Sequence, residues 1–132
     1  MILKELKSGR KVILVKVNYQ VIQVMLDEVI YIKALSDYIT IFTTHGKYVT
    51  LNTMKDAVYT LPVDEFPRTH RSYIVNVDFI ERTKGPWINI KGQENDCVGF
   101  EKEIPIGRSY KNGFRRSFLG TKPRKQALLK VA

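Results

Sequence analysis

The first half of the chain is a rapid succession of short segments with the composition of β-strands. They are rich in valine, isoleucine, tyrosine and threonine, and in places apolar and polar residues alternate as in half-buried strands. Turn-forming residues separate them, and strands are predicted at residues 11–17, 19–25, 29–33, 38–43 and 47–51. The pair His45 and Gly46 is typical of a tight hairpin, so His45 is expected to be a turn residue and not a ligand. This pattern predicts a mainly β protein.

The spacing of apolar residues changes to a helical period after residue 53. The side chains at i, i+3, i+4 and i+7 are Met54, Ala57, Val58 and Leu61. Asn52 or Thr53 can cap the start of this helix, and Pro62 ends it. We expect one short amphipathic helix whose apolar stripe packs on the sheet.

The second half of the chain returns to short extended segments and ends in a second helix. Strands are predicted at residues 77–80, 87–90 and 97–100. Residues 104–106 are expected to be extended, because proline fixes its own backbone and restricts the residue before it. Ser109 is predicted to cap a final helix. Its apolar face would carry Tyr110, Phe114 and Phe118.

Length and composition limit the chain to one domain. At 132 residues and 44% hydrophobic, it can bury one core. We expect an N-terminal segment or linker remnant at residues 1–10, a domain at 11–119 and a basic tail at 120–132. The single cysteine, Cys97, excludes a disulfide framework and is expected to be a small half-buried thiol. No cofactor or metal is expected. No apolar run approaches the roughly 20 residues that cross a bilayer, so a soluble cytoplasmic protein is expected.

The net charge of +9 is concentrated at the end of the chain. Residues 1–103 hold 14 Lys and Arg against 13 Asp and Glu, whereas residues 104–132 hold 8 basic residues and no acidic one. A field of this sign attracts a polyanion such as nucleic acid, and an acidic lipid surface would feel the same attraction. For the residues after Gly120, a disordered, solubilising end is the alternative.

One segment, FPRTHRSYIVN at residues 66–76, interleaves basic and hydrogen-bonding side chains with core-forming ones. Its basic members are Arg68, His70 and Arg71, and its short polar members are Thr69, Ser72 and Asn76. Such a surface suits the binding of an anion. No nucleophile, general base and orienting acid are laid out in it as a catalytic set, so the chain is not expected to be an enzyme.

Four short segments follow one another in a distinctive order. They are YIKA at residues 31–34, a helix ending in LP at 61–62, HRSYIVN at 70–76 and IPIGRSY at 104–110. Together they resemble the LytTR DNA-binding domain of bacterial LytR/AlgR-type response regulators, over most of the chain. The resemblance implies an elongated, mainly β fold of short antiparallel strands in small sheets, with one or two short helices. It also implies binding of double-stranded DNA by loops inserted into successive major grooves.

The resemblance places DNA contacts in three regions of this chain. They are residues 35–38, the block around His70 and Arg71, and residues 107–111. It implies that Arg71 and Arg108 contact bases, since a guanidinium can donate two parallel hydrogen bonds to guanine O6 and N7.

Further contacts follow from the same resemblance. Tyr38 or its neighbour Asp37 would contribute from the first region. His70 either faces a phosphate or acts as a structural hydrogen-bonding group. Contacts to the DNA backbone, which set register without reading sequence, are expected from Ser72, Asn76, Tyr110, Lys111 and Lys33. Asn76 has an alternative role, which is to close a turn through its own side chain.

The two arginines also have structural alternatives. Arg71 can instead pair with Asp78 or Glu81 on a nearby strand. Arg108 can instead pair with Glu103 or cap a backbone carbonyl. Either pairing would remove the guanidinium from the candidate DNA surface.

The chain departs from the family's pattern at two points. The connection between Ile90 and Ile104 is longer than usual and contains the polar run GQEND. Gly107 stands where many members carry serine. The glycine removes a possible phosphate donor and is expected to loosen the turn that presents Arg108.

The family resemblance also implies a regulatory context. Such domains usually follow a phosphorylatable receiver domain, and pairing of receivers promotes binding to repeated promoter sites. The chain is then either a fragment, with a receiver domain and a histidine kinase upstream, or a stand-alone regulator that self-associates on DNA by other means.

Two other classes of function stay open. An RNA-binding or single-stranded nucleic-acid-binding module would stack bases on exposed aromatic side chains. Its candidates are Tyr38, Tyr48, Trp87 and Phe100. A protein-interaction or small enzymatic domain would carry its basic charge incidentally.

Overall fold

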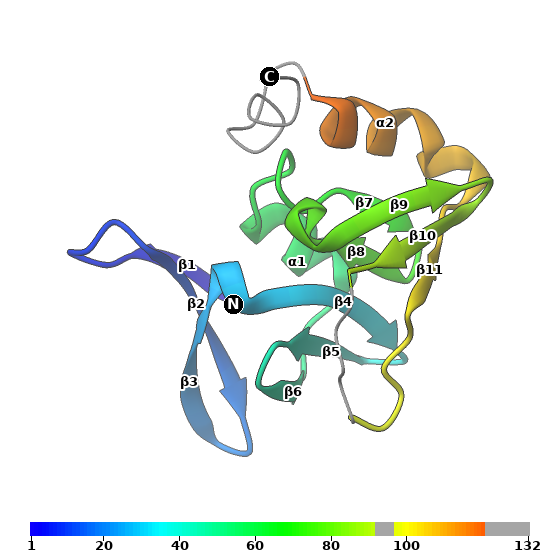
Figure 1. Ribbon diagram of the computed structural model, residues 1–132. Coiled ribbons are helices and arrows are strands. Elements are labelled where there is room, and N and C mark those ends of the chain that lie inside the picture. The colour runs from blue at the N-terminus through cyan, green and yellow to red at the C-terminus, as the bar shows by residue number, and fades with distance from the viewer. Residues whose placement is uncertain (92–96, 121–132) are drawn as a thin grey trace.

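The computed structural model describes residues 1–91 and 97–120, which form mostly strands (Figure 1). The strands are β1 (Ile2–Glu5), β2 (Lys11–Val17), β3 (Gln20–Met25), β4 (Val29–Leu35), β5 (Tyr38–Thr43), β6 (Gly46–Thr50), β7 (Arg68–His70), β8 (Tyr73–Val75), β9 (Ile80–Lys84), β10 (Trp87–Ile90) and β11 (Glu103–Pro105). The helices are α1 (Met54–Thr60) and α2 (Lys111–Leu119), and the short 3-10 turns are η1 (Leu26–Glu28), η2 (Val77–Phe79) and η3 (Arg108–Tyr110). The predicted mainly β class is confirmed.

The strands form three small antiparallel sheets. The central sheet has five strands in the order β6-β5-β4-β8-β7. Strands β1 to β3 form a second sheet that extends to one side of it, and β9 to β11 form a third on the other side (Figure 1). A hydrogen bond of 2.7 Å from the Thr50 hydroxyl to the Lys16 carbonyl joins the first two sheets at their margin.

The central sheet is buried on both faces, which explains the near-continuous apolar run of β4. Ile32 of β4 faces a core shared with the sheet of β1 to β3 and with α1. The neighbouring Tyr31 faces a second core, built with Ile88, Ile104 and Phe114 from the third sheet and α2. Successive strand residues point to opposite faces, so β4, β5 and β8 each supply residues to both cores. The central sheet is thereby held in place from both sides.

Helix α1 begins and ends where the sequence predicts. Thr53 is the N-cap: its hydroxyl accepts the Asp56 N–H at 3.1 Å, and the Asp56 carboxylate accepts the Thr53 N–H at 3.3 Å. These bonds satisfy two backbone donors at the start of the helix. Met54 and Ala57 are buried as expected, but Val58 is 40% exposed, so the apolar stripe is narrower than predicted.

Two strand predictions are wrong. Val77–Phe79 is the 3-10 turn η2, and the strand begins only at Ile80. Residues 97–100 form a turn closed by the Phe100 N–H and the Cys97 carbonyl at 3.1 Å. In both segments, single apolar side chains pack against the core without strand pairing. The Phe100 ring, for example, packs 5.5 Å from the Tyr31 ring.

The chain ends also differ in detail from expectation. Ile2–Glu5 pairs with β2, so part of the N-terminal segment adds an edge strand to the sheet of β1 to β3. Ser109 lies inside η3 and does not cap α2, whose N-cap is Tyr110. The expected apolar face of α2 is formed in part: the rings of Phe114 and Phe118 are stacked at 5.4 Å, whereas Tyr110 precedes the helix. His45 lies in the β5–β6 turn as predicted, and Cys97 is half-buried.

Candidate nucleic-acid interface

Three turns from distant parts of the chain lie at one end of the central sheet. Strands β4 and β8 are antiparallel neighbours, and the Ala34 N–H donates to the Ser72 carbonyl at 2.9 Å. This contact places the β4–β5 turn beside the β7–β8 turn. The Gly107 N–H donates to the Thr69 carbonyl at 2.7 Å, which adds the turn before α2. We call the last two the Arg71 turn (residues 71–72) and the Arg108 turn (residues 107–110).

The β4–β5 turn presents two of the expected contact residues. Leu35 pairs with Tyr38, and Ser36 between them adopts a left-handed φ of 58° that makes the tight turn. Asp37 is exposed at the tip, and Tyr38 is 49% exposed beside it. Both side chains are accessible at the same end of the sheet as Arg71.

Arg71 projects from the tip of the β7–β8 hairpin. Its side chain is exposed, and no other residue of the described ranges 1–91 and 97–120 forms a hydrogen bond or ion pair with its guanidinium. The alternative pairing with Asp78 or Glu81 is therefore not formed. The Arg71 backbone carbonyl, by contrast, accepts a 2.5 Å hydrogen bond from Arg68. Arg71 thus has a fixed main chain and a free side chain.

His70 is a structural hydrogen-bonding group on the same hairpin. Its Nδ1 accepts the Ser72 N–H at 3.1 Å, and its ring meets the Tyr73 ring edge-on with centroids 5.6 Å apart. An accepting Nδ1 leaves the ring proton of neutral histidine on Nε2. The second nitrogen therefore remains a donor.

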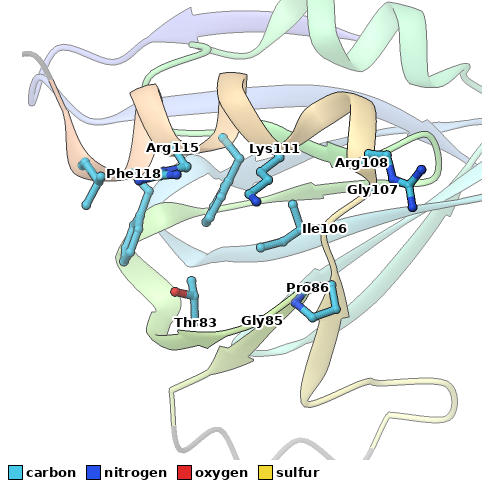
Figure 2. A pocket seen from close by; sticks show the side chains of 11 residues that line it. Thr83, Gly85, Pro86, Ile106, Gly107, Arg108, Lys111, Arg115 and Phe118 are labelled. Atoms are coloured by element: carbon cyan, nitrogen blue, oxygen red, sulfur yellow. The ribbon is translucent and has the colours of Figure 1, made fainter.

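Arg108 belongs to η3 and is exposed. It forms neither the ion pair with Glu103 nor a carbonyl cap within the part of the chain that the structure describes. Arg108 and Lys111 border a groove of about 750 Å³ between α2 and the β9–β10 turn, with Phe118 and Ile106 among its apolar walls. Figure 2 shows Lys111 pointing into this groove and Arg108 pointing away from it. Arg108 is thus the more outward of the two cations.

Gly107 lies in a compact turn, in which its carbonyl accepts the Tyr110 N–H at 3.0 Å, and the expected loosening of this turn stays a prediction. A Cβ atom built on Gly107 would lie 3.2 Å from Tyr110 Cδ2 and 3.5 Å from His70 Cδ2. A side chain at position 107 would therefore press on Tyr110 of the same turn, whereas it would make ordinary van der Waals contact with His70 of the other turn.

Lys33 has a partner that the sequence did not indicate. Its Nζ lies 2.6 Å from Glu101 Oε1 and 5.5 Å from the centroid of the Tyr73 ring. The hydrogen bond to Glu101 raises the pKa of Lys33, so the ammonium stays charged. Tyr73 donates its hydroxyl to the same carboxylate at 2.8 Å, and burial raises the pKa of that hydroxyl. Lys33 is engaged by this carboxylate and is not a free phosphate ligand.

Asn76 does not belong to the surface. It is 3% exposed, its Oδ1 accepts the Asp78 N–H at 2.9 Å, and its Nδ2 donates to the Val29 carbonyl at 2.8 Å. The side chain closes η2 and ties it to β4. The expected contact of Asn76 with the DNA backbone is thus wrong, and its alternative role as a turn-closing residue is the one observed.

Two negative observations concern other kinds of site. Among residues 1–91 and 97–120, no group of three or more His, Cys, Asp or Glu side chains is arranged to hold a metal ion. The same residues include no helix that is long and apolar enough to cross a membrane.

An exposed arginine on each of two fastened turns, at one end of a β fold, defines a surface suited to a polyanion. A sequence profile of the LytTr DNA-binding domain matches residues 19–118, so the chain belongs to the LytTR family of DNA-binding domains. A solved LytTr DNA-binding domain from Bacillus cereus has a similar fold, with a TM-score of 0.64. That match covers 80% of this chain and 94% of the solved chain at 24% identity.

The chain is also similar to part of longer proteins. It is 27% identical over 94 residues to the sensory transduction protein LytT of Bacillus anthracis, and 25% identical over 103 residues to LytT of Bacillus subtilis. These matches cover 71% and 78% of this chain, but only 37% and 42% of the two relatives. The LytTR family is a family of DNA-binding domains and not of enzymes.

Proposed function

We propose that this domain binds double-stranded DNA in a sequence-specific manner within a bacterial transcriptional regulator. The observation that carries the proposal is the state of Arg71 and Arg108. Both are exposed and without side-chain partners in the described ranges, and both stand on turns with a fixed main chain. Each guanidinium is available to form the bidentate pair with guanine that discriminates between bases by about 1–3 kcal/mol.

The other surface residues have supporting roles in this proposal. Asp37 and Tyr38 contribute from the β4–β5 turn. The polar groups of His70, Ser72, Tyr110 and Lys111 contact phosphates, with His70 donating from Nε2. Lys33 joins them only when its ammonium leaves Glu101, to which it is bonded at 2.6 Å. In this arrangement loops of the domain enter successive major grooves, and the Arg71 and Arg108 turns, which are bonded to each other through Gly107 and Thr69, contact neighbouring parts of the duplex.

The regulatory context is part of the same proposal. The relatives are named sensory transduction proteins, and the matched segment is less than half of their length. We propose that the domain acts in the cytoplasm as the output part of a two-component system, with a receiver domain and a histidine kinase upstream. Self-association on promoter repeats would double the number of grooves contacted.

Selection of bound duplexes from a random pool tests this function. The expected product is two similar half-sites about one helical turn apart. Arg71→Ala and Arg108→Ala should each lower the affinity for the selected duplex and reduce the base preference at one position of the site. Lys111→Ala should weaken binding to all sequences alike and reduce the salt slope by about one. Uniform weakening by all three variants would contradict the base-contacting roles.

A competition experiment separates duplex DNA from the alternative nucleic acid. The labelled best duplex is displaced with unlabelled copies of itself or with single-stranded RNA of the same length. Displacement by RNA at equal concentration would overturn the proposal. Of the aromatic side chains considered for base stacking, Phe100 is engaged by the rings of Tyr31 and Phe42 at 5.5 and 5.7 Å, whereas Tyr38 and Trp87 are exposed.

A further inference from the structure

Arg68 contacts both of the turns that carry the exposed arginines. It begins β7, and its half-buried side chain folds back over the hairpin. Its Nη2 donates to the Arg71 carbonyl at 2.5 Å, and its Nε donates to the His70 carbonyl at 3.3 Å. Two donors of one planar guanidinium thus hold the main chain of the residue that projects from the tip.

The flat face of the same guanidinium contacts the other turn. Its Cζ lies 5.4 Å from the centroid of the Tyr110 ring, within the range of a cation–π interaction. Tyr110 ends η3, the short turn that Arg108 begins. A single side chain therefore contacts the backbone of Arg71 by its edge and the Arg108 turn by its face.

The surroundings of Arg68 keep the two turns close together. A register shift in β7 between Arg68 and His70 leaves the Thr69 carbonyl to accept the Gly107 N–H at 2.7 Å. Gly107 also lies close enough to the His70 ring that an added Cβ would come within 3.5 Å of it. The main chain sets the distance between the turns, and the Arg68 guanidinium lies across them.

We propose that Arg68 is a positioning residue that couples Arg71 to Arg108 in DNA recognition. It does not itself contact a base; it fixes the angle at which each of the two side chains leaves its turn. This inference rests on the proposed function. The contacts with the His70 and Arg71 carbonyls need two donors in one plane, and the contact with the Tyr110 ring needs a flat, delocalised cation. Lysine offers neither, so it cannot replace arginine here.

The test is duplex selection and salt-dependent affinity with Arg68→Ala and Arg68→Lys. A bidentate contact corresponds to roughly a 5- to 150-fold preference for the correct base. We expect Arg68→Ala to reduce this preference at both the Arg71 and the Arg108 positions together, although neither residue is changed. Arg68→Lys keeps the charge, so its salt slope should stay near that of the wild type while the preference at both positions still falls.

Two controls isolate positioning from charge and from folding. Arg82→Ala removes an exposed arginine of β9 that lies outside the three turns, and it should leave the base preference unchanged. Tyr110→Phe removes the hydroxyl assigned to a phosphate but keeps the ring, so it should weaken binding to all duplexes alike and keep the base preference, whereas Tyr110→Leu should also reduce the preference at the Arg108 position. Thermal unfolding checks each variant, and Arg68→Lys decides the question if Arg68→Ala does not fold.

The outcomes separate the two levels of the proposal. A wild-type domain without sequence preference would overturn the proposed function. A selective wild type together with an Arg68→Lys variant that keeps both base preferences would overturn the coupling alone. Loss of preference at only one of the two positions would also contradict the coupling, because it would limit Arg68 to a single turn.

Discussion

At the scale of single residues, the basic side chains of the interface differ mainly in their partners. Arg71 and Arg108 have none among the described residues, whereas Lys33 is held by Glu101 and Arg68 by two carbonyls and a ring. The segments HRSYIVN and IPIGRSY pointed to Arg71 and Arg108, two arginines without side-chain partners among the described residues. They did not identify the state of Lys33, because Glu101 lies 68 residues away in the chain and comes from the segment that departs from the family pattern.

Glu101→Gln is expected to release Lys33 for DNA. The ammonium would lose its carboxylate partner and become available to a phosphate, so affinity for all duplexes should rise and the salt slope should increase by about one. Fluorescence anisotropy across a salt series measures both. Glu103→Gln is the control, because it removes an equal charge from β11. The Glu103 side chain is exposed and has no hydrogen-bond or ion-pair partner among the described residues. An equal gain in both variants would show that the effect is net charge alone.

At the scale of elements, local patterns predicted the structure wherever strand pairing or a cap follows from neighbouring residues. The strand at 11–17, the strand at 38–43 and the capped helix α1 match their predictions closely. The errors at Val77–Phe79 and residues 97–100 arose where apolar residues are buried singly against distant rings or strands. Asn76 was misassigned for a similar reason, since its second hydrogen bond joins a carbonyl 47 residues away.

Thr53→Ala tests the role of the cap as a purely structural element. Loss of the hydroxyl that accepts the Asp56 N–H should lower the free energy of unfolding by about 1 kcal/mol. Urea unfolding of the isolated domain measures the change. Lys55→Ala, an exposed position on the same helix, is the control and should change stability by less than about 0.5 kcal/mol. The preferred DNA site should be the same in both variants, and a shifted site would mean that α1 contributes to recognition.

At the scale of the whole molecule, the central sheet supplies the β4–β5 turn and the Arg71 turn as well as residues of both cores. Both of its faces are buried by other sheets and helices, so the accessible part of β4, β5, β7 and β8 is their common end. The basic charge, however, continues beyond the described residues into the last part of the sequence, which holds Lys122, Arg124, Lys125 and Lys130. Specificity and general affinity can therefore come from different parts of the chain.

Truncation after Gly120 is expected to separate these two contributions. Removal of four basic residues should weaken binding to every duplex and lower the salt slope by up to about 0.9 for each phosphate that the tail no longer neutralises. Duplex selection with the shortened protein should return the same preferred site. A different site would assign base recognition to the tail and would contradict the electrostatic role.

The link between Gly107 and Thr69 uses main-chain atoms only. Substitution at position 71 or 108 therefore leaves the separation of the two turns unchanged. On the proposed function, a regulator of this construction can acquire a new target by single substitutions while the spacing of the recognised base pairs is inherited intact. We therefore expect related regulators to bind promoters in which the spacing of the recognised base pairs is constant and the identity of the bases varies.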